Sequence, residues 1–224
     1  MSMSICSLQQ PQQWLLIVLS LVFATVATSC YTSIFSFGDS LTDTGNLNFI
    51  SQPQSPNCLL PPYGETHFHH PNGRCSNGRL VIDFIAEYLG LPYVKPYLGF
   101  KNGAAKERGS IENGVNFAVA GVTALGRSFF EEKGFVVGVT ANYSLMVQID
   151  EFKKMLPSIC NSTSRCKDVL GGSLFVVGEI GGNDYVFPLF AKNSYGDLIA
   201  YAPRIISIIT SAIRMKRSMT KPDV

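Results

Sequence analysis

Three short apolar segments of this sequence each stop at a glycine and a group of small polar residues. Apolar runs of this length, bounded by turn-forming residues, are typical of buried strands. They are Ser33–Phe37 with the following Gly38-Asp39-Ser40, Gly114–Gly121, and Ser173–Gly178 with the following Glu179–Asp184. Helical patterns separate them, and strands that alternate with helices predict an α/β fold with a parallel sheet.

The helices are expected from apolar residues that recur every three or four positions. In the helix expected over 79–89, the apolar stripe is Leu80, Phe84 and Tyr88, widened by Val81 and Ile85. In the helix expected over 144–156, with Ser144 as its cap, the stripe is Leu145, Ile149, Phe152 and Leu156. A last helix is expected over 197–213, interrupted by Pro203.

The candidate catalytic residues lie at the polar ends of the expected strands. In a parallel sheet these ends share one edge, where ligands of open α/β folds bind. Acyl transfer needs a nucleophilic hydroxyl and donors placed where the oxyanion forms. Ser40 offers the hydroxyl and a backbone N–H, Gly121 an unobstructed backbone N–H, and Asn183 a side-chain amide. The alternative is three ordinary strand-to-helix turns, which use the same residue types.

The segments FGDSLTDTGN, GVNFAVAG and GEIGGND resemble, in order, the first three blocks of the GDSL esterase/lipase family, or SGNH hydrolases. The segment beginning PYGETHFHH is similar to the linking region of the family's secreted plant branch. The resemblance implies a flavodoxin-like three-layer α/β/α sandwich and hydrolysis of carboxylic esters, small or lipid. It also implies that Ser40 is the nucleophile, with Gly121 and Asn183 as oxyanion-hole partners.

One block of that family has no counterpart here. Family members carry an Asp-x-x-His block in which His is the general base, and none occurs in these 224 residues. Residues 214–224 resemble no family element. We therefore expect a signal peptide at 1–29, a partial hydrolase domain at 30–213 and an unrelated basic tail at 214–224. A truncated product would explain this, with a fold that is incomplete at its carboxyl terminus.

The three histidines, His67, His69 and His70, could in principle replace that base, because the order of triad members along a chain is free. They lie in a loop beside the turn-forming Pro71-Asn72-Gly73. The interpretation we favour is a surface loop with solvated histidines. Metal binding by His67 and His69 would lack a third ligand at an obvious spacing. No cofactor or metal is expected.

The amino terminus predicts secretion. Residues 14–27 are an apolar run of signal-peptide length, followed by the small-x-small site Ala27-Thr28-Ser29. The run is shorter than the ~20 residues of a membrane span. A retained signal anchor is the alternative, because the preceding residues include no Lys or Arg; a lipoprotein signal ending at Cys30 fits less well.

Cysteines and sequons agree with a secretory route. Cys58 with Cys75, and Cys160 with Cys166, are close enough in sequence to close local loops, although four cysteines allow three pairings. N-glycans are possible at Asn142 and Asn161, which begin Asn-x-Ser/Thr sequons. The formal net charge of +2 gives no electrostatic reason to propose a nucleic-acid partner.

Two hypotheses follow from the sequence. The first is a secreted serine esterase, with turnover impaired in this chain because no Asp–His pair is present to deprotonate Ser40. The second is a non-catalytic secreted protein that binds an ester or glycan, or an unstable splice fragment.

Overall fold

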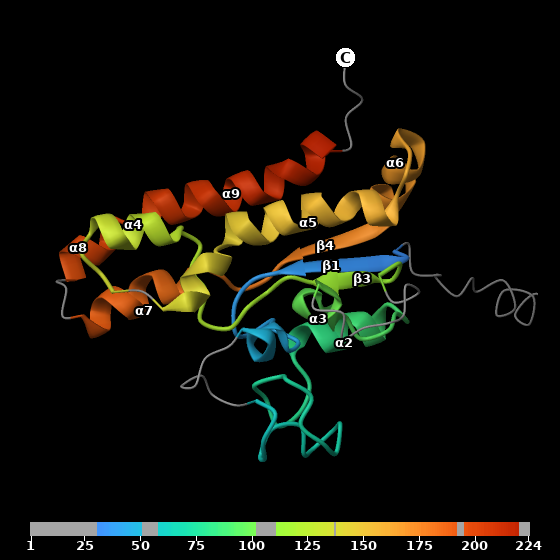
Figure 1. Ribbon diagram of the computed structural model, residues 1–224, viewed down its shortest axis with the longest axis horizontal. Coiled ribbons are helices and arrows are strands. Elements are labelled where there is room, and N and C mark those ends of the chain that lie inside the picture. Colours follow the sequence, from blue (N-terminus) through green and yellow to red (C-terminus); the bar gives the residue numbers. More distant parts are fainter. Residues whose placement is uncertain (1–30, 51–57, 102–110, 137, 192–194, 220–224) are drawn as a thin grey trace, which may run out of the picture. The chain divides into compact units, whose positions relative to one another are not determined.

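The computed structural model describes residues 31–50, 58–101, 111–136, 138–191 and 195–219 (Figure 1). These residues belong to one compact unit. The expected signal peptide lies outside the described residues, and the division of the chain at residues 213 and 214 stays a prediction. No described helix is long and apolar enough to cross a membrane.

The unit is built on a parallel four-stranded sheet with the strand order β2-β3-β1-β4. The strands are β1 (Ser33–Phe37), β2 (Lys95–Pro96), β3 (Gly114–Asn116) and β4 (Ser173–Val177). In β1, Phe35 lies opposite Val115 of β3 on one side and Phe175 of β4 on the other. The fold is therefore the α/β architecture that the alternation of strands and helices predicts.

Helices surround the sheet. Those before β4 are α2 (Val81–Tyr88), α3 (Tyr97–Lys101), α4 (Arg127–Glu132), α5 (Leu145–Ile159) and α6 (Thr163–Gly171). After β4 come α7 (Gly182–Phe190), α8 (Tyr195–Ile199) and α9 (Ala202–Met219). Two 3₁₀ turns, η1 (Asn46–Phe49) and η3 (Val139–Tyr143), lie in the connections.

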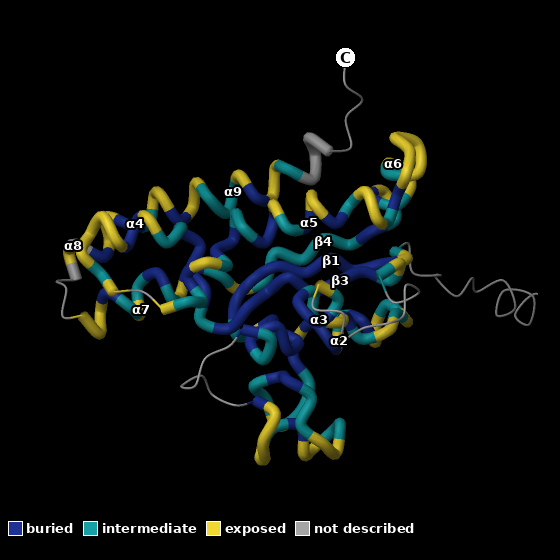
Figure 2. The backbone as a smooth tube through the Cα atoms, viewed as in Figure 1, coloured by how far each residue is buried: buried dark blue, intermediate teal, exposed yellow. Residues whose placement is uncertain are grey.

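Strand β1 is buried along its whole length (Figure 2). Its alternating side chains supply both faces of the sheet. Phe35 and Phe37 pack against α5 and α9, whereas Ile34 packs against α2. Helices α5 and α9 thus cover one face and α2 the other, which gives the three layers of an α/β/α sandwich (Figure 1).

Helix α2 forms where it is expected but turns a different face inward. Leu80 is buried and Ile85 packs against the core as predicted, but Phe84 is 50% exposed and Tyr88 90% exposed, so that part of the predicted stripe is wrong. Ile82 and Ala86 are buried in their place. The reason is Asp83, whose carboxylate is fully buried, pairs with Arg74 and accepts a hydrogen bond from the Leu80 N–H. The helix keeps Asp83 facing inward because separating it from Arg74 would leave a buried charge unpaired, which is strongly destabilising.

Helix α5 confirms its predicted apolar face, with Leu145, Ile149 and Phe152 buried. Ser144 precedes it, but its side chain makes no capping hydrogen bond. The helix expected over 197–213 is two helices, because α8 ends at Ile199 and α9 begins at Ala202. Pro203 is then the second residue of α9, where no N–H is needed for a helical bond.

Strand β3 ends at Asn116, earlier than expected, although the N–H groups of Phe117 and Val119 still donate to the Ser36 and Gly38 carbonyls at 2.7 and 3.3 Å. Between these two bonds the side chain of Asn116 takes up backbone groups. The Ala118 N–H donates to Asn116 Oδ1 at 2.7 Å, and Asn116 Nδ2 donates to the Thr42 carbonyl. Two disulfides close the expected local loops, Cys58–Cys75 and Cys160–Cys166, with Cα atoms 5.0 and 5.1 Å apart.

Candidate active site

The site begins where β1 ends. Gly38 has a φ of +151°, and a Cβ there would lie 2.9 Å from the Glu179 carbonyl oxygen and 3.2 Å from Thr42 Oγ1. Its backbone is held by the amide of Gln148 on α5: the Gly38 N–H donates to Oε1 at 3.0 Å, and Nε2 donates to the Gly38 carbonyl at 2.9 Å. Gln148 therefore pairs with Gly38 as a neighbouring strand would.

Ser40 lies in the turn that follows. The N–H groups of Thr42 and Asp43 both donate to the Asp39 carbonyl, at 3.1 and 3.0 Å, so the chain turns sharply around Ser40. Ser40 is partly exposed, and the next residue, Leu41, is 60% exposed. Among the described residues, the Ser40 hydroxyl has no hydrogen-bond partner. A hydroxyl placed this way is accessible to a substrate from solvent.

Asp43 ties this turn to the loop after β3. Its buried carboxylate accepts hydrogen bonds from four backbone N–H groups at 2.6–3.0 Å. Three of these donors are local, in Gly45, Asn46 and Leu47, and the fourth is Ala120. Asp43 thereby brings the residue before Gly121 against the turn that carries Ser40.

Gly121 has a φ of +79°, a left-handed conformation that favours glycine. Only Thr140 atoms lie near the position of a Cβ, at 3.6 Å and beyond. Its carbonyl accepts a hydrogen bond from Thr140 Oγ1 at 3.3 Å, and its N–H has no partner among the described residues. A glycine N–H of this kind suits an oxyanion donor.

Asn183 lies in the first turn of α7 and reaches back to the same loop. Its Nδ2 donates to the Val122 carbonyl at 2.8 Å. The next residue, Asp184, binds the same loop just after Val122. Its carboxylate accepts hydrogen bonds from the N–H groups of Ala124 and Leu125 at 2.8 and 2.9 Å. The residues flanking Gly121 are thus bonded on one side to the Ser40 turn and on the other to Asn183.

Three carboxyl groups around these turns are buried, and burial raises the pKa of each. Burial, followed by a side-chain hydrogen bond with Glu179, raises the pKa of Asp39 to about 7. Burial raises the pKa of Asp43 and of Asp184 to about 6, although the backbone N–H groups that they accept act in the opposite direction. Each group therefore gives up its proton at a higher pH than an exposed Asp would.

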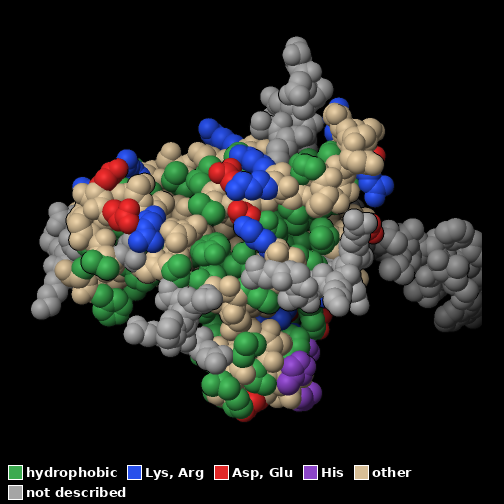
Figure 3. Space-filling view, viewed as in Figure 1, with side chains coloured by type: hydrophobic (Ala, Val, Ile, Leu, Met, Phe, Trp, Pro, Cys, Tyr) green, Lys and Arg blue, Asp and Glu red, His purple; other side chains and the backbone are tan. Residues whose placement is uncertain are grey.

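The histidines gather in a lobe beside the sheet (Figure 3). His67 Nε2 lies 2.9 Å from the Tyr93 hydroxyl. Tyr93 comes two residues before β2, at the amino end of a parallel sheet, whereas Ser40 follows the carboxyl end of β1. His67 and Ser40 therefore belong to opposite edges of the sheet. His69 and His70 are exposed, which fits the interpretation of a solvated loop.

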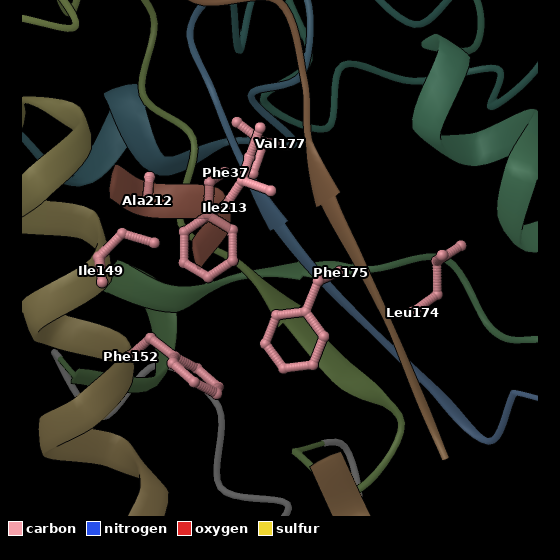
Figure 4. A pocket seen from close by; sticks show the side chains of 8 residues that line it. All are labelled: Phe37, Ile149, Phe152, Leu174, Phe175, Val177, Ala212 and Ile213. Atoms are coloured by element: carbon pink, nitrogen blue, oxygen red, sulfur yellow. The ribbon is translucent and has the colours of Figure 1, made fainter. Parts of the chain in front are cut away.

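An apolar cavity of about 320 Å³ lies on the α5–α9 face of the sheet (Figure 4). The residues that line it are Phe37, Ile149, Phe152, Leu174, Phe175, Val177, Ala212 and Ile213; the side chain of Leu174 itself packs on the α2 face. Phe37 and Val177 come directly before Gly38 and Gly178, so the cavity reaches the strand ends. Within the described ranges, no three His, Cys, Asp or Glu side chains are grouped to hold a metal ion.

Sequence reasoning named Ser40, Gly121 and Asn183 but missed Gln148 and did not foresee how Asp43 acts. Asp43 lies within the quoted block FGDSLTDTGN, which could have drawn attention to it. Gln148 lies on the α5 helix, where the apolar stripe and the charged residues predict the faces but give no role to a glutamine. A glutamine between Leu145 and Ile149, on the buried side of that stripe, is the signal that could have identified it.

Comparisons with known proteins identify the family of this chain. A family model described as GDSL-like Lipase/Acylhydrolase matches residues 34–221. A GDSL esterase/lipase of Arabidopsis thaliana is 50% identical over 201 residues, which cover 87% of this chain and 49% of the relative. The sinapine esterase of Brassica napus is 50% identical over 198 residues, with 87% and 49% covered. The chain thus spans about half the length of the curated relatives it matches.

Proposed function

Because this chain belongs to the GDSL-like lipase/acylhydrolase family, we propose that it is a carboxylic ester hydrolase in which Ser40 is the nucleophile. The similarity to plant GDSL esterase/lipases and to a sinapine esterase supports an ester substrate, a small molecule or a lipid. The open position of Ser40 at the carboxyl edge of the sheet supports its role.

In the proposed reaction, Ser40 Oγ attacks the ester carbonyl carbon and the carbonyl oxygen becomes an oxyanion. The N–H groups of Ser40 and Gly121 and the amide of Asn183 stabilise that oxyanion. The tetrahedral intermediate collapses and its bond to the alkoxide oxygen breaks. The alkoxide takes up the proton that the Ser40 hydroxyl released and leaves as the alcohol, and an acyl group remains on Ser40. Water then attacks the acyl group, releases the carboxylic acid and restores the Ser40 hydroxyl.

The observation that carries this proposal is the hydrogen bond from Asn183 Nδ2 to the Val122 carbonyl. An amide nitrogen has two hydrogens, and this bond uses one of them. It fixes the plane of the amide beside Gly121, so the second hydrogen remains available as a donor. Two oxyanion donors from different elements are thereby held together before substrate arrives, which is the preorganisation that such catalysis needs.

These 224 residues do not contain the sequence block that carries the general base in the family. No Asp-x-x-His occurs in them, and His67 belongs to the opposite edge of the sheet. The 224-residue polypeptide alone is therefore expected to hydrolyse esters slowly. Removal of triad members in a serine hydrolase leaves ~10³–10⁴-fold acceleration over water, from the oxyanion hole and binding.

The test compares p-nitrophenyl butyrate hydrolysis by three purified proteins. They are the 224-residue polypeptide, its Ser40→Ala variant, and the polypeptide extended with a carboxyl-terminal segment that carries the family's Asp-x-x-His block. We expect slow hydrolysis, a loss in the Ser40→Ala variant and an increase in the extended protein. Unchanged hydrolysis in Ser40→Ala would refute the nucleophile, and equal rates with and without the extension would refute the assignment of the base.

We also propose that the protein is secreted and that Asn142 and Asn161 carry N-glycans. Both asparagines are exposed, and the two disulfides suit an oxidising compartment. Expression in plant cells, followed by treatment of the medium with an N-glycosidase, tests both points. A protein that stays inside the cell, or whose mass is unchanged by the enzyme, would contradict them.

A further inference from the structure

The pairing of β1 with β4 continues past the ends of both strands. The Gly178 N–H donates to the Phe37 carbonyl at 2.7 Å, and the Asp39 N–H donates to the Glu179 carbonyl at 3.1 Å. Beyond this point the two chains diverge, one into the turn of Ser40 and the other toward Asn183. Among the described residues, Asp39 and Glu179 form the last backbone hydrogen bond between the two segments that lead into the proposed catalytic turns.

Their side chains meet as well. The Asp39 carboxyl accepts a hydrogen bond from the Leu41 N–H at 3.2 Å and makes a second hydrogen bond with the Glu179 carboxyl. Glu179 Oε1 in turn lies 3.0 Å from where a Cβ on Gly182 would stand, directly before Asn183. The carboxyl pair thus spans the space between the Ser40 turn and the start of α7.

Two carboxyl groups form a hydrogen bond only when one of them carries a proton, because an ionised carboxylate has no donor. The charged groups that act on Asp39 are Glu179 and, more weakly, Asp184, and both are acidic. Helix α5 contributes the neutral amide of Gln148 at the adjacent Gly38. This environment favours a pair with one proton over a pair with two negative charges.

We propose that Asp39 and Glu179 share one proton and act as positioning residues that fasten the Ser40 turn to the Asn183 turn. This inference rests on the proposed function for the roles of Ser40 and Asn183. Loss of the proton would set two carboxylates against each other, separate the turns and displace the oxyanion donors from the nucleophile. The pair itself touches no reacting atom.

The direction of the Asp39 titration agrees with this arrangement. Burial and the bond to Glu179 raise the pKa of Asp39 to about 7. A carboxyl whose pKa is higher in the folded state binds its proton more tightly there, so its contribution to stability is complete at low pH. That contribution is lost as the pH rises toward and through 7.

The test measures thermal unfolding of the 224-residue protein from pH 5 to 8.5, with Asp39→Asn and Glu179→Gln as variants. Asparagine has the shape of the protonated acid, accepts from the Leu41 N–H and donates to Glu179 at every pH. We expect the melting temperature of Asp39→Asn, relative to wild type, to rise by about 5 °C across this range. Asp150→Asn, the same change at an exposed carboxylate, should follow wild type.

Glu179→Gln keeps a donor for Asp39, so it should also flatten the pH dependence, and combining both changes should add little. An Asp39→Asn variant that is less stable than wild type by the same amount at every pH would overturn the proposal. That result would mean that Asp39 acts as an ionised acceptor for Leu41. Fully additive effects of the two substitutions would also overturn it.

A kinetic readout separates positioning from stability alone. In the protein extended with an Asp-x-x-His segment, kcat of wild type should fall above pH 7 with little change in KM, and Asp39→Asn should remove that fall. An unchanged fall in the variant refutes the positioning role. Failure of this inference can be told apart from failure of the proposed function. The unfolding experiment tests the carboxyl pair without any measurement of hydrolysis, and the Ser40→Ala variant tests the nucleophile.

Discussion

At the scale of single residues, the site is held by buried polar side chains that bond to backbone. Gln148 satisfies both the N–H and the carbonyl of Gly38, and Asp43 satisfies four N–H groups. A buried backbone group without a partner costs about 1–3 kcal/mol. These side chains therefore hold the turn around Ser40, because moving either of them away would leave buried backbone groups unpaired.

Asp43→Asn is the most direct test of this. Asparagine has one acceptor oxygen where the carboxylate has two, so about half of the four N–H groups would lose their partner. We expect the free energy of unfolding to fall by about 3 kcal/mol in urea denaturation at pH 7. Asp150→Asn serves as the control and should change it by less than about 0.5 kcal/mol. A similarly small loss in Asp43→Asn would show that the four bonds are not needed.

The sequence identifies the residues that the family motifs contain but not those that act across long separations. Ser40, Gly121 and Asn183 stand at strand ends and in recognisable blocks, so their neighbourhood could be predicted. Gln148 lies 110 residues from Gly38, and no local pattern links them. Its partner becomes known only when α5 is placed against β1.

At the scale of elements, the ends of β1 and β4 approach so closely that side chains do not fit between them. A Cβ on Gly178 would fall well inside contact distance of Thr42 Oγ1 and 3.2 Å from the Phe37 carbonyl oxygen. Gly178 does not need a left-handed conformation, so the demand there is purely for space. The close approach is what brings Asp39 beside Glu179.

Gly178→Ala should therefore destabilise the protein by about 1–3 kcal/mol through overpacking. Because the nearest obstacle is the Thr42 hydroxyl, adding Thr42→Ala should recover part of that loss. Urea denaturation of both single variants and the double variant measures the coupling. If Gly178→Ala costs the same whether residue 42 is Thr or Ala, the crowding at this position has been misassigned.

The elements also show where periodicity fails as a guide. The apolar pattern of α5 predicts its buried face correctly, since Leu145, Ile149 and Phe152 meet the phenylalanines of β1. The pattern of α2 does not, because counting apolar residues gives no weight to Asp83. Its ion pair with Arg74 depends on a loop whose path the sequence leaves open.

At the scale of the whole molecule, the buried acids give a definite pH dependence. The pKa values of Asp39, Asp43 and Asp184 are all raised above 3.8, to between about 6 and about 7. Each of these carboxyl groups binds its proton more tightly in the folded state. Its contribution to the free energy of unfolding is complete below pH 3.8 and is lost as the pH rises through its folded pKa. Glu151 acts in the opposite direction. Partial burial acts to raise its pKa, but hydrogen bonds from Tyr97 and Lys101 outweigh burial and lower the pKa. Its contribution to stability is therefore lost only as the pH falls into the acid range.

We therefore expect the melting temperature to be highest near pH 4–5, to decline through pH 7 and to level off above it. Calorimetry from pH 4 to 9 provides the measurement. The Asp39→Asn and Asp43→Asn variants should each decline less steeply than wild type. A maximum at or above pH 7 would contradict the assigned direction of these shifts.

The central place of β1 in the sheet has a consequence for the order of events during translation. Ser33 and its partner Ser173 are 140 residues apart, and β1 completes its pairing only with β4. At ~5–20 residues per second, the ribosome needs ~7–30 s to make the intervening chain. The earliest strand to leave the ribosome thus waits longest for its neighbours, and a chaperone that shields its apolar side chains in that interval should raise the yield of folded protein.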